Sequence, residues 1–240
     1  MLRISGLSTN VLRLTRKRPL VRYSHSYSLA PTNPYLDFSN HATHPLPPPN
    51  SLTLYPEFLT PEAQAQLVTA ADRKLRRICG RKYWDGHFDG VIRNYRECSV
   101  SAWAGPSAGD EADAVPREVV RKIKATVESE VGETVKWIDP HILDLGLGGE
   151  IRAHVDNIKA SGSIITGLCL LAPAVIIFRH VKDPCISFSA LMNPGTLYVQ
   201  RDALRFDYTH EIPDDSALRS FKATAVPRGR RISVMMRNAR

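Results

Sequence analysis

The chain has few cysteines and no long hydrophobic run. Its four cysteines include no Cys-x-x-Cys pair, so the patterns that define zinc ribbons and small disulfide scaffolds are missing. The longest apolar candidate, residues 164–178, is interrupted by a glycine and a proline, and no stretch reaches the ~18 apolar residues of a membrane-spanning helix. We therefore expect reduced, mostly structural thiols and no membrane span.

Acidic residues are missing from the chain before Asp37. The segment that precedes Asp37 carries six basic residues, which account for all but two of the chain's +8 formal charges. A leading segment rich in Arg, Ser and Leu and free of acids has the composition of a mitochondrial transit peptide. A chloroplast transit peptide, or a disordered basic arm that binds nucleic acid, has similar chemistry. We expect residues 1–29 to form a transit peptide that directs the protein to the mitochondrial matrix.

Prolines and caps divide the next hundred residues. Residues 30–51 contain six prolines, which exclude a helix or a central strand and predict a linker or irregular arm. A first helix is expected to begin after Thr60, an N-cap followed by proline, and to end at Gly80. Apolar residues at helical spacing predict a second helix from Pro116 to Gly132.

Short apolar runs alternate with turns after Val135. About eight of them fall within a hundred residues, a spacing typical of an antiparallel sandwich or jelly roll. Two helices followed by a run of strands predict an α+β fold, with the helices packed against the outside of the β-structure. Gly148-Gly149 and Pro194-Gly195 are turn signals between runs. The expected strands are 142–147, 150–155, 163–171, 175–178, 185–191, 195–199, 205–208 and 231–237.

A candidate metal site starts from His154-Val155-Asp156. Residues i and i+2 of a strand point to the same face, so His154 and Asp156 can reach one metal ion, and His210 can complete the set from another strand. Two imidazoles and one carboxylate are the ligands of a non-haem iron facial triad, which leaves positions open for a co-substrate and oxygen. Either histidine taken alone is better explained as a hydrogen-bonded core residue.

Other histidines compete for these roles. A second His-x-Asp tripeptide, His87-Phe88-Asp89, lies between two glycines before the strand-rich region and has no later partner of its own. We interpret it as a loop feature near the mouth of the site. His180 is an alternative third ligand, but it follows Asp156 by only 24 residues and lies at an expected turn.

Residues farther along the chain carry a resemblance to a known family. Arg231 follows His210 by 21 residues, and the order His-x-Asp, distant His and basic residue resembles the Fe(II)/2-oxoglutarate dioxygenases, whose core is a double-stranded β-helix, or jelly roll. The segment RISVMMR at 231–237 resembles the Arg-x-(Asn/Ser)-x-x-x-Arg strand of the AlkB family. Further segments resemble a mitochondrial branch of that family: 141–173, 194–198, 209–212 and 227–234. The resemblance covers residues 52–237 and predicts one dioxygenase domain at 52–240.

The resemblance implies which residues form the site. By position, three residues match the iron ligands and three match the contacts of 2-oxoglutarate: His154, Asp156 and His210, and Tyr198, Arg231 and Arg237, respectively. A guanidinium can pair bidentately with the distal carboxylate of this co-substrate. Members that repair nucleic acids carry an Asn and a Tyr shortly before the His-x-Asp, at positions that are here Leu143 and Leu145. That departure weakens an inference of base repair.

Three functions stay open. The first is a mitochondrial Fe(II)- and 2-oxoglutarate-dependent dioxygenase, a monomer that uses O2 to hydroxylate a protein or a small molecule; the resemblance links this branch to programmed necrosis and fatty-acid metabolism. The second is an RNA N-demethylase, which needs a base pocket lined by aromatic residues. The third is a non-catalytic regulator that binds metal and 2-oxoglutarate. Candidates for the base pocket are Tyr83, Trp84, Phe88, Tyr95 and Trp103.

A basic run over residues 73–82 also bears on RNA. It could hold phosphates, but a solvated helix face explains it better, because Asp72 opens the run and no aromatic array interleaves it for base stacking.

Overall fold

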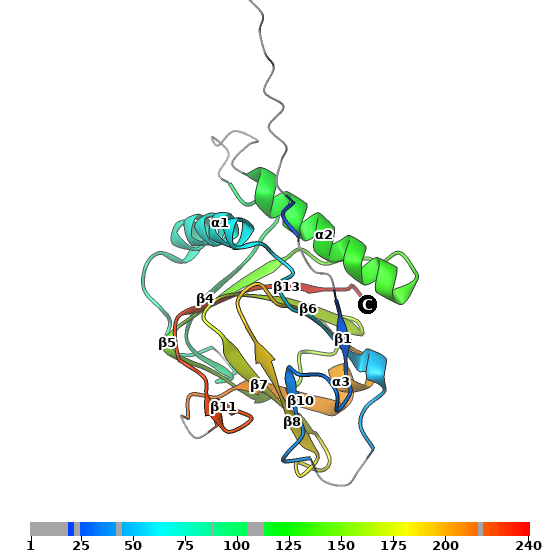
Figure 1. Cartoon of the computed structure of the whole chain (residues 1–240). Helices are drawn as coiled ribbons and strands as arrows, with labels where there is room; N and C mark the ends of the chain where they lie inside the picture. Colours follow the sequence, from blue (N-terminus) through cyan, green and yellow to red (C-terminus); the bar gives the residue numbers. More distant parts are fainter. Residues whose placement is uncertain (1–18, 22–24, 42–44, 88, 105–112, 216–217) are drawn as a thin grey trace, which may run out of the picture.

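A computed structural model describes the chain except residues 1–18, 22–24, 42–44, 88, 105–112 and 216–217. Most strands join one curled antiparallel sheet, and two long helices lie on one side of it (Figure 1). The sheet contains β1 (Tyr27–Ser28), β2 (Leu36–Asp37), β3 (Leu52–Tyr55), β4 (Ile92–Ser99), β5 (His141–His154), β6 (Ile164–Leu171), β7 (Ala174–His180), β8 (Ser187–Met192), β9 (Leu197–Arg201), β10 (Tyr208–Ile212) and β13 (Arg231–Arg237). A separate hairpin pairs β11 (Ser220–Phe221) with β12 (Thr224–Ala225).

The strand order is that of a double-stranded β-helix. It runs β1-β3-β9-β6-β13-β5-β10-β7-β8-β2, and β4 pairs with the other edge of β5. The first part of β5 pairs with β13 and its last part pairs with β10, so this 14-residue strand belongs to both halves of the sheet. The α+β jelly roll expected from the sequence is therefore confirmed.

The two predicted helices are present and cover one face of the sheet. In α1 (Pro61–Cys79) the side chain of Thr60 accepts a hydrogen bond from the backbone N–H of Ala63, and Gly80 ends the helix with a φ of 75°. Helix α2 (Ala114–Val131) begins two residues before the expected Pro116 and ends at Gly132. Apolar residues of both helices pack against the outward residues of β13 in one core cluster, which includes Leu67, Leu75, Val119, Ile123, Ile232, Val234 and Met236. None of the helices in the described residues is both long and apolar enough to cross a membrane.

A buried ion cluster joins α1 to the sheet. The Asp144 carboxylate on β5 is fully buried and accepts hydrogen bonds from Arg96 on β4, from Arg230 and from the hydroxyl of Tyr83. Arg230 also pairs with Asp72 on α1. A buried carboxylate is tolerated only when it is paired and hydrogen-bonded, so this cluster fixes the register of the helix against the sheet.

Two of the expected elements were wrong. Gly148 and Gly149 do not form a turn, since both lie inside β5, where Gly148 has a φ of 91°. The glycines let the strand bend at the point where its neighbour changes from β13 to β10. Residues 205–207 are helical, in α3 (Asp202–Asp207), because one helical turn buries Leu204 and Arg205 together; only Tyr208 of that expected strand belongs to a strand.

Segments with weak sequence signals complete the sheet. Strand β4 was not predicted, since its sequence IRNYRECS lacks a clear alternation of apolar and polar residues. Residues 30–51, expected as a linker or irregular arm, contain β2, which pairs with β8, and a 3-10 turn (Pro49–Ser51). Leu36 is buried in the interior of the barrel. The proline-rich segment therefore lies against the domain.

The described part of the N-terminal segment also packs on the sheet. Strand β1 pairs with β3, and Leu29 is buried with 1% of its surface exposed. Val21 forms a β-bridge with Leu59. Most of the expected transit peptide lies outside the described residues, but removal of all of residues 1–29 would delete these contacts, whereas removal of residues 1–18 would keep them.

We expect the two truncations to differ in stability. Deletion of residues 1–18 should leave the free energy of unfolding unchanged, whereas deletion of residues 1–29 should lower it by at least ~2 kcal/mol, the smaller cost of losing a buried Leu side chain. In the full chain, Leu29→Ala should cost ~2–5 kcal/mol. Urea unfolding followed by circular dichroism measures these values, and equal stability of the two truncated proteins would contradict the prediction.

Candidate active site

The structure brings His154, Asp156 and His210 together. His154 is the last residue of β5, Asp156 follows it by two positions, and His210 lies in the middle of β10. His154 and His210 are direct partners in the antiparallel ladder between the two strands, with ring centroids 4.4 Å apart. One ligand atom from each of the three side chains lies within 4.8 Å of the others.

The hydrogen bonds around the three residues leave the right atoms for a metal ion. His154 Nδ1 lies 2.8 Å from the carbonyl oxygen of Arg152, which can only accept, so Nε2 is left as the lone-pair donor. Asp156 Oδ2 accepts a 2.7 Å hydrogen bond from Arg237 Nε. Asp156 Oδ1 lies 3.2 Å from His154 Nε2 and 3.7 Å from His210 Nε2. Two imidazole nitrogens and one carboxylate oxygen therefore converge on one point, the donor set that suits non-haem iron.

The protonation states of Asp156 and His210 also suit a metal. Burial acts to raise the pKa of Asp156, but the adjacent His154 and the positive charge of Arg237 outweigh it and hold that pKa well below the usual range. Burial lowers the pKa of His210 to about 4. An ionised carboxylate and a neutral imidazole are the forms that coordinate metals, so this part of the site needs little further deprotonation.

The three residues line a cavity of about 480 Å³. Other polar residues that line this cavity contact one another in a chain. His87 Nδ1 lies 2.7 Å from Asp89 Oδ1, and His87 Nε2 lies 3.5 Å from Glu97 Oε1. Glu97 Oε2 in turn lies 2.8 Å from His141 Nε2. All four of these side chains line the cavity.

Tyr198 also lines this cavity. It lies on β9 opposite Gly167 of β6, where an added Cβ would lie 2.3 Å from the tyrosine ring. Only glycine lets the ring lie flat against the sheet at this point. Burial raises the pKa of the Tyr198 hydroxyl, so the hydroxyl stays protonated and can donate a hydrogen bond to a carboxylate.

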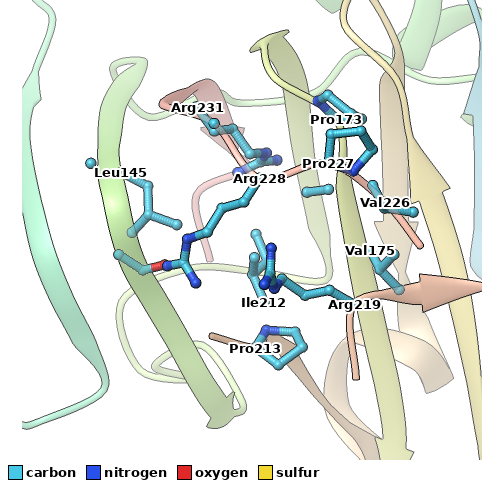
Figure 2. Close-up of a pocket in the computed structure, with 14 residues that line it drawn as sticks. Leu145, Pro173, Val175, Ile212, Pro213, Arg219, Val226, Pro227, Arg228 and Arg231 are labelled. Atoms are coloured by element: carbon cyan, nitrogen blue, oxygen red, sulfur yellow. The ribbon is translucent and has the colours of Figure 1, made fainter. Parts of the chain in front are cut away.

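Strand alternation places the expected 2-oxoglutarate arginines inside the barrel. Arg237 lines the cavity beside His154, Asp156 and His210, which we call the iron-side cavity. Arg231, on the same face of β13, is 4% exposed and points into a second, smaller pocket shown in Figure 2. Leu143 lines the first cavity and Leu145 the second, so the two leucines at the positions of the departure from the family pattern form an apolar wall along β5. Arg230 faces the opposite way, toward Asp144.

Comparison with known proteins decides the family. No protein-family model matches the chain. The alpha-ketoglutarate-dependent dioxygenase alkB homolog 7, mitochondrial, of Mus musculus is 35% identical over 186 residues, 77% of each chain. The Bos taurus protein of the same name is 36% identical over 183 residues, 76% of each chain. The chain belongs to the AlkB homologue 7 family. It is therefore a dioxygenase that depends on Fe(II) and on 2-oxoglutarate, which is another name for alpha-ketoglutarate.

Solved structures agree with the fold. The structure of OsALKBH1 superposes with a TM-score of 0.54 at 14% identity and covers 81% of this chain and 100% of its own. A prolyl-4-hydroxylase of Pseudomonas putida superposes with a TM-score of 0.52 at 12% identity, over 79% of this chain and 92% of its own. Both comparisons support the jelly-roll architecture of this AlkB homologue 7 member.

The structure separates the rival histidines from the metal triad. His180 packs edge-on against Tyr208, and its Nδ1 lies near the backbone N–H groups of Lys182 and Asp183, outside the triad. His87 and Asp89 bond to each other and line the same cavity as the triad without belonging to it. Their position agrees with a loop feature near the mouth.

Sequence reasoning missed Arg205, which supports the loop after Asp156. Its side chain is 1% exposed, and Nη2 lies 3.2 Å from Ser161 Oγ and 3.4 Å from the carbonyl oxygen of Asn157. Its positive charge acts on Asp156 and His210. The sequence predicted a strand over residues 205–208, and that strand gave no reason to expect a buried arginine. In the structure Arg205 lies in one turn of helix, which buries its side chain.

We expect loss of metal binding when Asp156 or His210 is replaced. Asp156→Ala or His210→Ala should abolish Fe(II) binding and 2-oxoglutarate turnover, because two remaining ligands cannot hold the ion in an open site. Both variants should keep the fold. The matched control is His180→Ala, which should bind iron normally. Titration with Mn(II) followed by electron paramagnetic resonance measures binding, and normal binding by His210→Ala with loss in His180→Ala would refute the ligand assignment.

Proposed function

We propose that this dioxygenase binds Fe(II) through His154, Asp156 and His210 and hydroxylates a protein or small-molecule substrate in mitochondria. The observation that carries the proposal is the convergence of two imidazole nitrogens and one carboxylate oxygen at the end of an open cavity. Bound iron would use O2 to convert 2-oxoglutarate to succinate and CO2 while oxygen is inserted into a C–H bond. On an N-methyl group that product would release formaldehyde.

The residues of this chain have separate roles in the proposal. Arg237 holds Asp156 Oδ2 and leaves Oδ1 toward the two histidines. Tyr198 can donate its hydroxyl hydrogen to the co-substrate, and Arg231 can pair with the distal carboxylate as a bidentate partner. The leucines at 143 and 145 keep the space between these groups apolar, which excludes water and strengthens each electrostatic contact.

The charge of the cavity favours a protein or small molecule over RNA. Its lining includes the carboxylates Asp89, Glu97 and Asp139 besides the triad. Among the described residues, Arg237 is the one Lys or Arg that lines it, and Arg237 is already paired with Asp156. A phosphate backbone needs unpaired Lys or Arg side chains, and this mouth would repel it. The basic run on α1 borders a different pocket, lined by Arg76, Arg81 and Arg96 among others.

The aromatic candidates for a base pocket lie elsewhere. Tyr83 bonds to Asp144 on the outer side of β5, and Trp103 is buried in the core beneath the helices. Trp84 and Tyr95 contact each other edge to face, and neither lines the iron-side cavity. Phe88 lies outside the described residues. A flipped base requires stacking partners over the reacting carbon, and the four described candidates do not supply them.

An open cavity also favours an enzyme over a non-catalytic regulator, because nothing among the described residues fills the space in front of the triad. Residues 1–35, which include the expected transit peptide at 1–29, should direct a fused reporter to the mitochondrial matrix, in keeping with the mitochondrial names of both relatives. The link to programmed necrosis and fatty-acid metabolism stays a prediction from the family resemblance.

Arg231→Ala should weaken 2-oxoglutarate binding strongly. Removing one partner of a buried charge pair costs ~2–5 kcal/mol, or ~30- to 5,000-fold in affinity, while metal affinity should stay nearly unchanged. Arg231→Lys should fall between, because an ammonium lacks the planar fork. Calorimetric titration of the Mn(II)-loaded protein measures the dissociation constant.

Arg230→Ala is the control for that titration. It removes a positive charge from the residue just before β13, which faces away from Arg231 toward Asp144. The variant should lower stability, because the buried Asp144 carboxylate loses a partner, yet leave the 2-oxoglutarate affinity unchanged. If Arg230→Ala lost the co-substrate and Arg231→Ala kept it, the assignment of the two faces would be wrong.

Turnover measurements test the substrate class. With Fe(II), 2-oxoglutarate and O2, succinate formation should rise when peptides or metabolites extracted from mitochondria are added, and N-methylated RNA oligonucleotides should leave it at the basal rate, because the mouth of the cavity is acidic. Asp156→Ala supplies the background. Stimulation by RNA that falls steeply with salt would instead favour the demethylase.

A further inference from the structure

A pocket of about 40 Å³ lies beside Arg231 and is distinct from the cavity that the triad lines. Three arginines line this arginine pocket (Arg219, Arg228 and Arg231), and the other lining residues are apolar or small, with no acidic residue among them. Figure 2 shows Arg231 entering from β13 and Arg219 entering from the side of the β11–β12 hairpin. The space exceeds what one water molecule needs and suits a group of the size of a carboxylate.

One of the three arginines is already neutralised. Arg228 pairs with the carboxylate of Asp214 and also donates to the carbonyl oxygen of Gly149 at 2.7 Å. The other two differ from it, because the Nε atoms of Arg219 and Arg231 are buried without a hydrogen-bond partner among the described residues. No carboxylate of the described residues forms an ion pair with either guanidinium.

The fold holds Arg219 at this position. Its carbonyl oxygen accepts a 2.9 Å hydrogen bond from the N–H of Val226, which continues the β11–β12 hairpin. Phe221 of that hairpin is buried against Val175 and Ile177 of β7. The backbone that carries Arg219 is therefore fixed against the barrel at a position from which the side chain lines the pocket.

We infer that the arginine pocket binds a carboxylate and that Arg219 is its second guanidinium. Arg231 is buried and Arg219 is half-buried, and two unpaired cations beside one small apolar space are unfavourable without an anion. Carboxylates suit guanidinium groups because each can accept parallel N–H hydrogen bonds. The carboxylate has two sources: the distal carboxylate of 2-oxoglutarate, or a separate small acid. The inference rests on the proposed function through the role of Arg231.

Titration of 2-oxoglutarate into the Mn(II)-loaded full chain tests the inference. Arg219→Gln should raise the dissociation constant at least tenfold, and Arg219→Lys, which keeps the charge, should raise it less. The matched control is Lys222→Gln, which removes one positive charge from the same hairpin outside the pocket and should bind like the natural protein. Thermal unfolding verifies that the Gln and Lys variants at 219 remain folded.

A truncated ligand identifies the source of the carboxylate. 2-Oxovalerate keeps the keto-acid end and the chain length of 2-oxoglutarate but lacks the distal carboxylate. If Arg219 contacts the co-substrate, Arg219→Gln should weaken 2-oxoglutarate while 2-oxovalerate binds equally to both proteins. If the occupant is a separate acid, 2-oxoglutarate affinity should be unchanged, and acetate should raise the melting temperature of the natural protein but not of Arg219→Gln.

The inference fails if Arg219→Gln matches Lys222→Gln in both measurements. Arg231→Ala then distinguishes failure of the role inferred for Arg219 from failure of the proposed function. Loss of 2-oxoglutarate in Arg231→Ala would leave the proposed function intact and remove only Arg219 from the site. Unchanged 2-oxoglutarate affinity in Arg231→Ala would remove the co-substrate assignment itself.

Discussion

The site depends on β5, the one strand that belongs to both halves of the barrel. Its first part pairs with β13 and its last part pairs with β10, so a single run of backbone places His154 opposite His210 and Leu145 opposite Arg231. The metal ligands and the arginine at the far end are thereby held at a fixed separation. A register shift of one residue in either ladder would turn these side chains out of the barrel.

Strand β13 shows how alternation divides charge between two environments. Arg230 and Arg231 are neighbours in sequence and face opposite sides of the sheet. On the outer side, Asp144 and Asp72 neutralise Arg230, and the cluster joins helix to sheet. On the inner side, no described carboxylate pairs with Arg231. Buried cations of the two kinds have different consequences: the paired one stabilises the fold, and the unpaired one is preorganised for an anionic ligand.

Local patterns were enough to predict the parts of the site that lie on regular strands. The period of two relates Arg231 to Arg237, which lie on one face of β13. His154 ends β5 and Asp156 follows it outside the strand, but both line the same cavity, as the spacing of the two residues predicted. The glycine and threonine caps likewise predicted α1. These features depend on residues close in sequence, so periodicity and capping chemistry report them directly.

The features that sequence reasoning missed depend on contacts between distant segments. Gly148 and Gly149 have the composition of a turn, but they lie inside β5, between the residues that pair with β13 and those that pair with β10. Gly167 has meaning only once Tyr198 is known to lie across from it. Arg205 and Arg219 follow the same rule, since a buried guanidinium cannot be told from a surface one until the segments that cover it are placed.

The two leucines on β5 connect these observations to co-substrate recognition. Where nucleic-acid repair members of the family have an Asn and a Tyr, Leu143 and Leu145 offer no hydrogen bond, so polar contacts to a dicarboxylate must come from other strands. Tyr198 lies on β9 and Arg231 on β13. An apolar wall facing a guanidinium lowers the local dielectric and strengthens the pairing of the guanidinium with a carboxylate, while it leaves that carboxylate with few donors. A second guanidinium from the β11–β12 hairpin supplies the donors that β5 lacks. In this arrangement the departure from the family pattern on one strand and the unpaired arginine on the hairpin are parts of the same site.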